Sequence, residues 1–198
     1  YYVCCLWIFP LAFIMGSGME IMMKKTFKTS ELVIMALFTA ILCVSAYISI
    51  PIGIASITLL NFIILLIAFV FPLRDSLIIV ILWMIMGACG IPVFIMGHSG
   101  VGYLLGVTGG YTWAFLVVTI YLGLAKGKQY SRLKYTIHAI IASILVDLVG
   151  MIWWMVLGKL TLKSAFLMGF VPFIPLDMVK SVVAAQICPV FTRLLQQD

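Results

Sequence analysis

The chain has 198 residues, of which 65% are hydrophobic and 9% are charged, and its mean hydropathy is +1.29. This composition lies far outside the range of soluble domains. The formal net charge of +6 would suggest nucleic-acid binding in a soluble protein, but here the Lys and Arg positions follow loop boundaries, as membrane topology requires. We therefore expect an integral membrane protein surrounded by lipid, with no nucleic-acid partner.

The apolar stretches predict helices. They approach or exceed the roughly 20 residues that cross a bilayer as a helix, and they are too continuous for the alternating pattern of a membrane barrel. Residues 1–22 are also apolar, but they lack the basic region of a signal peptide. We expect them to be an N-terminal extension rather than a seventh span, followed by one six-helix membrane domain over residues 23–198.

Proline, glycine and basic residues divide this domain into six predicted helices. They cover Glu31–Ile50, Ile57–Phe71, Ser76–Cys89, Tyr111–Ala125, Tyr135–Leu157 and Pro175–Leu195. A Gly-rich connection without Lys or Arg spans residues 91–110, and a short stretch, 159–171, precedes the last helix. The fold class is all-α, a six-transmembrane-helix bundle.

Basic residues indicate the orientation of this bundle. If the first helix begins in the cytoplasm, nine basic residues fall on the inside, and only Lys159 and Lys163 fall on the outside. The nine are Lys24, Lys25, Lys28, Arg74, Lys126, Lys128, Arg132, Lys134 and Arg193. The positive-inside rule then predicts that both ends of the six-helix core are cytoplasmic.

The last predicted helix carries an acid and a base in an apolar setting. Asp177 and Lys180 are three residues apart, so they share one helix face. Ionisable groups at membrane depth are costly and usually pair or line a polar cavity. The topology puts both near the outer end, under the 91–110 connection. A structural ion pair, a ligand site, and an enzyme site with Asp177 as acid or base remain open from these residues.

Other candidates are weaker. In GVTGGY, residues 106–111, glycines permit close approach and two side chains carry hydroxyls, which is typical of a turn, of tight helix packing or of a ligand site. Ala36 and Ala40 form a small-xxx-small pair, suited to packing within the bundle or against a partner. Asp147 lies near the midplane and is expected to pair with Lys180, to tune a ligand site, or to be neutral. His98 and His138 are expected to be loop and helix-end residues.

Several activities lack their motifs. The chain has no GxxxxGK[ST] phosphate loop, no HExxH and no GxSxG. Its five cysteines include no CxxC and no metal-ligand spacing. We expect no metal, no cofactor, and no ATP hydrolysis by this chain through that phosphate loop.

Five segments, in order, resemble BioY, the biotin-binding S components of energy-coupling factor (ECF) transporters. ALFTA is similar to that family's AxxxA motif, ISIPIG with SITLLN to IPxGPVPITLQ, and GACGIPVF to G-xx-G-x-PVF. GVTGGYTWAF is similar to GPTGGYLxGF, and FIPLDMVK to FIPGDLxK. The likeness covers nearly the whole chain after residue 24.

This resemblance implies a membrane subunit that binds biotin in an outside-facing cavity and is not an enzyme. The implied partners are a transmembrane coupling protein, meeting the chain at Ala36 and Ala40, and two cytoplasmic ATPases. The implied ligand site comprises Thr58, Asn61, Thr108, Gly109, Gly110, Tyr111, Asp177 and Lys180. A stand-alone small transporter and a membrane-embedded enzyme are the rival classes.

The chain departs from the family pattern at four positions. Val107 and Ser56 replace prolines, Leu60 replaces the Gln of TLQ, and Leu176 replaces a Gly beside Asp177. Asp147 is an additional charge. These differences leave a related small heterocycle as an alternative ligand.

Overall fold

The computed structural model describes residues 28–52, 55–127 and 130–195. The chain divides into two compact units, residues 1–34 and 35–198, with the boundary inside helix α2 (Thr29–Ser45). The predicted N-terminal extension, residues 1–22, lies outside the described residues. The packing described below is that of the second unit.

Within the described residues, six long helices form the framework, as predicted. They are α2 (Thr29–Ser45), α3 (Leu60–Val70), α4 (Leu73–Ala88), α6 (Gly109–Ala125), α7 (Arg132–Leu157) and α9 (Ile174–Leu195). The start of α9 agrees with the prediction within one residue. The limits of the first two predicted helices were wrong, because α2 ends at Ser45 rather than Ile50 and α3 begins at Leu60 rather than Ile57.

A short β-hairpin lies between the end of α2 and the start of α3. Strands β1 (Ser49–Ile52) and β2 (Ala55–Thr58) pair antiparallel, with Ser49 opposite Thr58. A proline inside this segment lacks the N–H that helix continuation requires, and the β-branched residues around it favour a strand. The hairpin delivers Thr58 and the first turn of α3 to the same end of the bundle as the start of α9.

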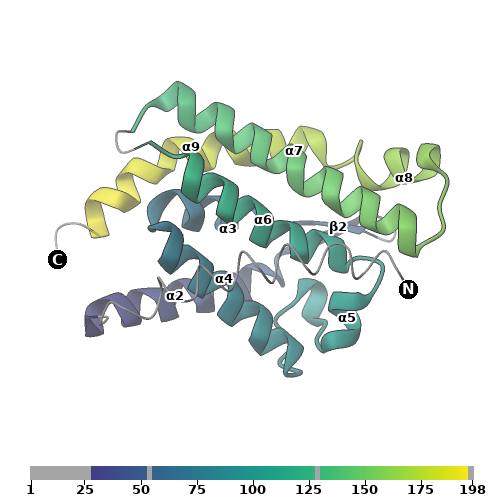
Figure 1. Ribbon diagram of the computed structural model, residues 1–198, viewed down its shortest axis with the longest axis horizontal. Coiled ribbons are helices and arrows are strands. Elements are labelled where there is room, and N and C mark those ends of the chain that lie inside the picture. The colour runs from purple at the N-terminus through teal and green to yellow at the C-terminus, as the bar shows by residue number, and fades with distance from the viewer. Residues whose placement is uncertain (1–27, 53–54, 128–129, 196–198) are drawn as a thin grey trace. The chain divides into compact units, whose positions relative to one another are not determined.

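Helix α6 is central, since it packs against α3, α4 and α7, while α9 packs against α3 and α7 (Figure 1). Two reciprocal glycine contacts bring α6 and α7 together. A Cβ at Gly110 would lie 2.2 Å from the Cβ of Trp153, and a Cβ at Gly150 would lie 2.2 Å from the ring of Tyr111. Only glycine fits at either position, so these contacts determine where Tyr111 lies.

The predicted connection between α4 and α6 is structured. It contains the 3-10 turn η1 (Ile95–Gly97) and the short helix α5 (Val101–Leu105). Three tryptophan indoles donate hydrogen bonds to its backbone carbonyls: Trp83 to Val93 at 2.9 Å, Trp113 to Leu104 at 3.1 Å, and Trp153 to Gly106 at 3.0 Å. These donors come from α4, α6 and α7, so the connection is anchored to three helices. The second short stretch, before α9, forms α8 (Leu162–Gly169).

Membrane character is visible in the helices and their surfaces. Helices α7 and α9 are long and apolar enough to cross a membrane, and α2, α3 and α6 are apolar but shorter, with 17, 11 and 17 residues. Large apolar side chains are exposed along them, including Leu37, Ile152 and Val179. Such surfaces are unfavourable in water and are suited to lipid.

Candidate ligand-binding site

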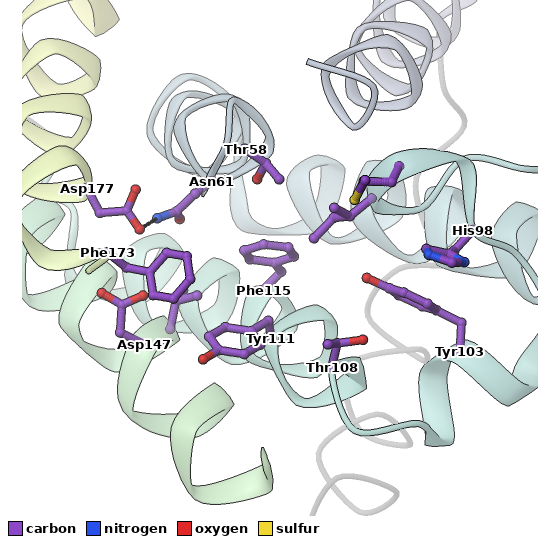
Figure 2. Close-up of a pocket in the computed structure, with 13 residues that line it drawn as sticks. Thr58, Asn61, His98, Tyr103, Thr108, Tyr111, Phe115, Asp147, Phe173 and Asp177 are labelled. Carbon is purple, nitrogen blue, oxygen red and sulfur yellow. Dashed lines mark hydrogen bonds between the residues drawn. The ribbon is translucent and has the colours of Figure 1, made fainter. Parts of the chain in front are cut away.

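A cavity of about 210 Å³ opens at the end of the bundle where β2, α5 and the start of α9 meet. Its wall is built from β2, α3, η1, α5, α6, α7 and the start of α9 (Figure 2). The lining residues are Thr58, Asn61, Ile95, Met96, His98, Tyr103, Thr108, Tyr111, Phe115, Val146, Asp147, Phe173 and Asp177. The volume is below the roughly 300–1,000 Å³ typical of drug-sized pockets, so it suits a small ligand.

Asp177 is held on both sides. Its Oδ1 accepts from the Lys180 ammonium at 2.8 Å. Its Oδ2 accepts from the Asn61 amide at 3.0 Å (Figure 2). The Lys180 ammonium also donates to the carbonyl of Thr58 at 2.9 Å. Asp177 is only 6% exposed, and a carboxylate at such a position needs these partners. The network therefore ties α9 to the hairpin and to α3.

The predicted site residues separate into two groups. Thr58, Asn61, Thr108, Tyr111 and Asp177 line the cavity, whereas the other three do not. Lys180 contacts Asp177 from behind the wall.

The remaining two predicted residues, Gly109 and Gly110, are buried at the start of α6. A Cβ at Gly109 would lie 2.1 Å from the carbonyl oxygen of Leu104, so this glycine, like Gly110, serves close packing. Of the interpretations open for GVTGGY, tight packing describes the two glycines. The cavity contacts come from Thr108 and Tyr111.

Tyr111 is positioned by its hydroxyl and its ring. The hydroxyl donates to the carbonyl of Gly169 at 2.7 Å, and the ring lies 6.2 Å from that of Phe173, measured between centroids. A Cβ at Gly150 would enter the same ring, as described above. These contacts place one face of an aromatic ring in the cavity wall, which suits an apolar part of a ligand.

Sequence reasoning missed the aromatic residues of the connection. Tyr103 stacks on Phe94 and on His98, with centroids 4.9 and 5.5 Å apart and planes 18° from parallel in both pairs. Burial raises the pKa of the Tyr103 phenol, and hydrogen bonds with Thr108 and Thr112 partly offset this. The phenol therefore stays neutral and polar at the cavity wall. The available signal was a tyrosine and a histidine in an otherwise Gly-rich, uncharged connection.

Asp147, the additional acid, lies in the cavity wall. It is 3% exposed and interacts electrostatically with Asp177 and with Lys180. In Figure 2, Asp147, Asn61 and Asp177 gather at one end of the cavity, and His98 and Tyr103 lie at the other. The cavity thus has an acidic end and an aromatic end.

Two departures from the family pattern lie away from the cavity. Leu176, expected to add bulk beside Asp177, is 45% exposed and is not a lining residue, and Val107 is also exposed. Leu60 is fully buried, but its neighbour Asn61 brings an amide into the wall.

The predicted partner surface and metal content concern other parts of the molecule. Ala36 and Ala40 are both exposed on α2. Within the described ranges, no group of three or more His, Cys, Asp or Glu side chains is arranged to hold a metal ion.

Known proteins are similar to this chain along nearly its whole length. The family model described as "BioY family" matches residues 22–197. A probable biotin transporter BioY of Pyrococcus horikoshii is 35% identical over 158 residues, which cover 79% of this chain and 93% of the relative. The biotin transporter BioY of Thermotoga maritima is 32% identical over 157 residues, covering 79% of this chain and 92% of the relative.

A solved structure has the same fold. The crystal structure of the S-component for biotin from an ECF-type ABC transporter aligns with a TM-score of 0.74 and 24% identity, covering 87% of this chain and 96% of that one. The fold is therefore that of an ECF S-component. With the family model matched from residue 22 to residue 197, the chain belongs to the BioY family.

Proposed function

We propose that this chain is the substrate-binding membrane subunit of an ATP-driven ECF importer, and that it takes up biotin. The observation that carries the proposal is the cavity of about 210 Å³ at one end of a membrane bundle, with Asp177 held in its wall by Asn61 and Lys180. Family membership supports it, since the relatives that this chain matches over most of their length are named as biotin transporters.

The chemistry of the cavity matches this ligand class. Biotin combines an apolar ring and chain with two polar ends, a cyclic urea and a carboxylate. The wall likewise combines aromatic and aliphatic side chains, such as Tyr111, Phe115 and Phe173, with polar groups at its two ends. A few polar groups in a largely apolar pocket fix the orientation of a ligand. We assign Asp177, Asn61, Thr58, Thr108 and Tyr111 to direct ligand contact, and Lys180 to holding Asp177.

The ligand is transported unchanged. Both carboxylate oxygens of Asp177 already accept hydrogen bonds, from Lys180 and Asn61, which favours binding over acid–base chemistry. The cell membrane would hold the bundle with both ends of the six-helix core in the cytoplasm, because the basic residues are concentrated on that side. The cavity then faces outward.

The partners would be a transmembrane coupling protein and two cytoplasmic ATPases. Exposure of Ala36 and Ala40 on α2 supports a contact there, since small residues allow close helix approach. ATP hydrolysis in these partners would drive reorientation of the loaded bundle.

Loading requires the connection over the cavity to open and close. Its middle part contributes Ile95, Met96 and His98 to the wall, and Met96 has a positive φ of 59°. Such a backbone conformation is strained for a non-glycine residue and often marks a functional segment. We assign the movement to this part, which lies between the tryptophan-held carbonyls and is joined to the backbone after α2 by the Met96 N–H, which donates to the Ala46 carbonyl at 3.2 Å.

Binding and uptake test the proposal separately. The purified chain is expected to bind labelled biotin one-to-one and to release it unchanged. Formation of a new product would instead indicate an enzyme, and stronger binding of another heterocycle in a competition panel would replace biotin as the ligand. In cells, uptake is expected to stop when the ATPases are deleted. Uptake that persists would indicate a stand-alone transporter.

A further inference from the structure

The acidic end of the cavity contains hydrogen-bond acceptors that nothing in the described part of the chain satisfies. Asp147 is 3% exposed, and no described residue donates a hydrogen bond to its carboxylate. Asn61 uses its amide N–H on Asp177, and its Oδ1 is buried with no hydrogen-bond partner among the described residues. A buried polar group without a partner costs free energy, so two such groups in one wall point to donors that arrive with a ligand.

The positive charge at this end is already committed. The Lys180 ammonium donates to Asp177 and to the carbonyl of Thr58, and it does not line the cavity. Asp147 is therefore an additional acid facing an ion pair that is already complete. A ligand carboxylate placed here would not gain the Lys180 ammonium as a partner, whereas a neutral group with N–H donors would supply the hydrogen bonds that Asp147 and Asn61 Oδ1 lack.

We propose that Asp147, with Asn61 Oδ1, forms a subsite that binds paired N–H donors of the ligand. A cyclic urea fits this requirement, because it carries two N–H donors on one rigid ring and no charge. This inference rests on the proposed function and deepens it: the ureido ring lies at the acidic end, and the ligand carboxylate lies toward His98 and Tyr103. Asp147 then determines specificity for the cyclic urea of the ligand rather than for its aliphatic chain.

Biotin and two analogues, each methylated at one ureido nitrogen, test the subsite. Wild-type protein in detergent is expected to bind one analogue at least 10-fold more weakly than biotin, since one hydrogen bond to a buried acceptor is removed. Asp147→Leu is expected to bind biotin roughly 10- to 100-fold more weakly and to lose the discrimination against that analogue. Asp147→Asn keeps a carbonyl acceptor and should fall between the two.

Matched controls separate this inference from a general disturbance of α7. Ser143→Ala removes another buried polar group of α7, bonded to Ser181 and outside the cavity, and it should keep biotin affinity within about 2-fold because it removes no ligand contact. If Asp147→Leu fails to fold, Asp147→Asn with the two analogues gives the result. The inference is overturned if Asp147→Leu binds biotin as the wild type does or keeps its full discrimination, or if Asp147→Asn equals the wild type in both respects. Wild-type protein that does not bind biotin would overturn the proposed function itself.

Discussion

The hydroxyl of Tyr130 donates a 3.0 Å hydrogen bond to the carbonyl oxygen of Ala185. Ala185 lies four residues before Pro189, which is inside α9 and has no backbone N–H to offer that carbonyl. The tyrosine, from the segment just before α7, therefore replaces the helical hydrogen bond that the proline removes. Lipid provides no such donor, so the replacement must come from the protein.

Tyr130→Phe is expected to lower the free energy of unfolding by about 1 kcal/mol, because the Ala185 carbonyl loses its donor. The ring contact with Tyr135, 4.8 Å between centroids, is retained in this variant. In a Pro189→Ala background the same substitution should cost less, since residue 189 then supplies an N–H. Thermal unfolding of the four proteins in one detergent measures the difference. An equal cost in both backgrounds would contradict the link between Tyr130 and the proline.

Asp177→Ala is expected to abolish biotin binding while membrane insertion and overall folding persist. The variant leaves the Lys180 ammonium and the Asn61 amide without their shared acceptor. The wall therefore loses its carboxylate and the hydrogen bonds that orient these two side chains. Asp177→Asn, which keeps the shape, should still weaken binding roughly 100-fold, since the charged acceptor is gone. Equilibrium binding of labelled biotin to purified protein gives both values.

Leu176→Ala is the matched control for the Asp177 variants. Leu176 is the neighbouring residue, is 45% exposed and does not line the cavity, so its truncation should leave affinity unchanged. Normal binding by Asp177→Ala would mean that the ion pair only stabilises the bundle.

Much of this arrangement could be predicted from sequence. Pro175 at the start of an apolar run, with Asp177 and Lys180 one turn later, correctly predicted the start of α9 and a paired acid and base. The hairpin could not be predicted as easily, because the β-branched and apolar residues around Pro51 continue the hydrophobic runs of the helices on both sides. Tyr103 and His98 reach the cavity from a connection that tryptophans of α4, α6 and α7 anchor. Such tertiary contacts leave no periodic signal in the sequence.

Gly150→Ala is expected to weaken biotin binding about 10-fold and to destabilise the fold by roughly 1–3 kcal/mol, as overpacking does. The added methyl group would lie 2.2 Å from the ring of Tyr111, so the ring must move within the cavity wall. Gly102→Ala adds the same group where nothing lies within 4 Å, and it should change neither quantity. Binding and thermal unfolding of both variants decide this. Unchanged binding by Gly150→Ala would show that the Tyr111 position is not critical for the ligand.

Ala36→Trp is expected to leave biotin binding intact and to break association with the coupling protein. Ala36 is exposed on α2 and is not a lining residue of the cavity. An indole at this position would prevent the close approach of a partner helix without reaching the ligand. Val183→Trp places the same side chain on an exposed position of α9 and serves as the control. Co-purification of each variant with the complete ECF module, beside its biotin affinity, measures the two effects. Association that survives Ala36→Trp, or that Val183→Trp disrupts equally, would move the partner surface away from α2.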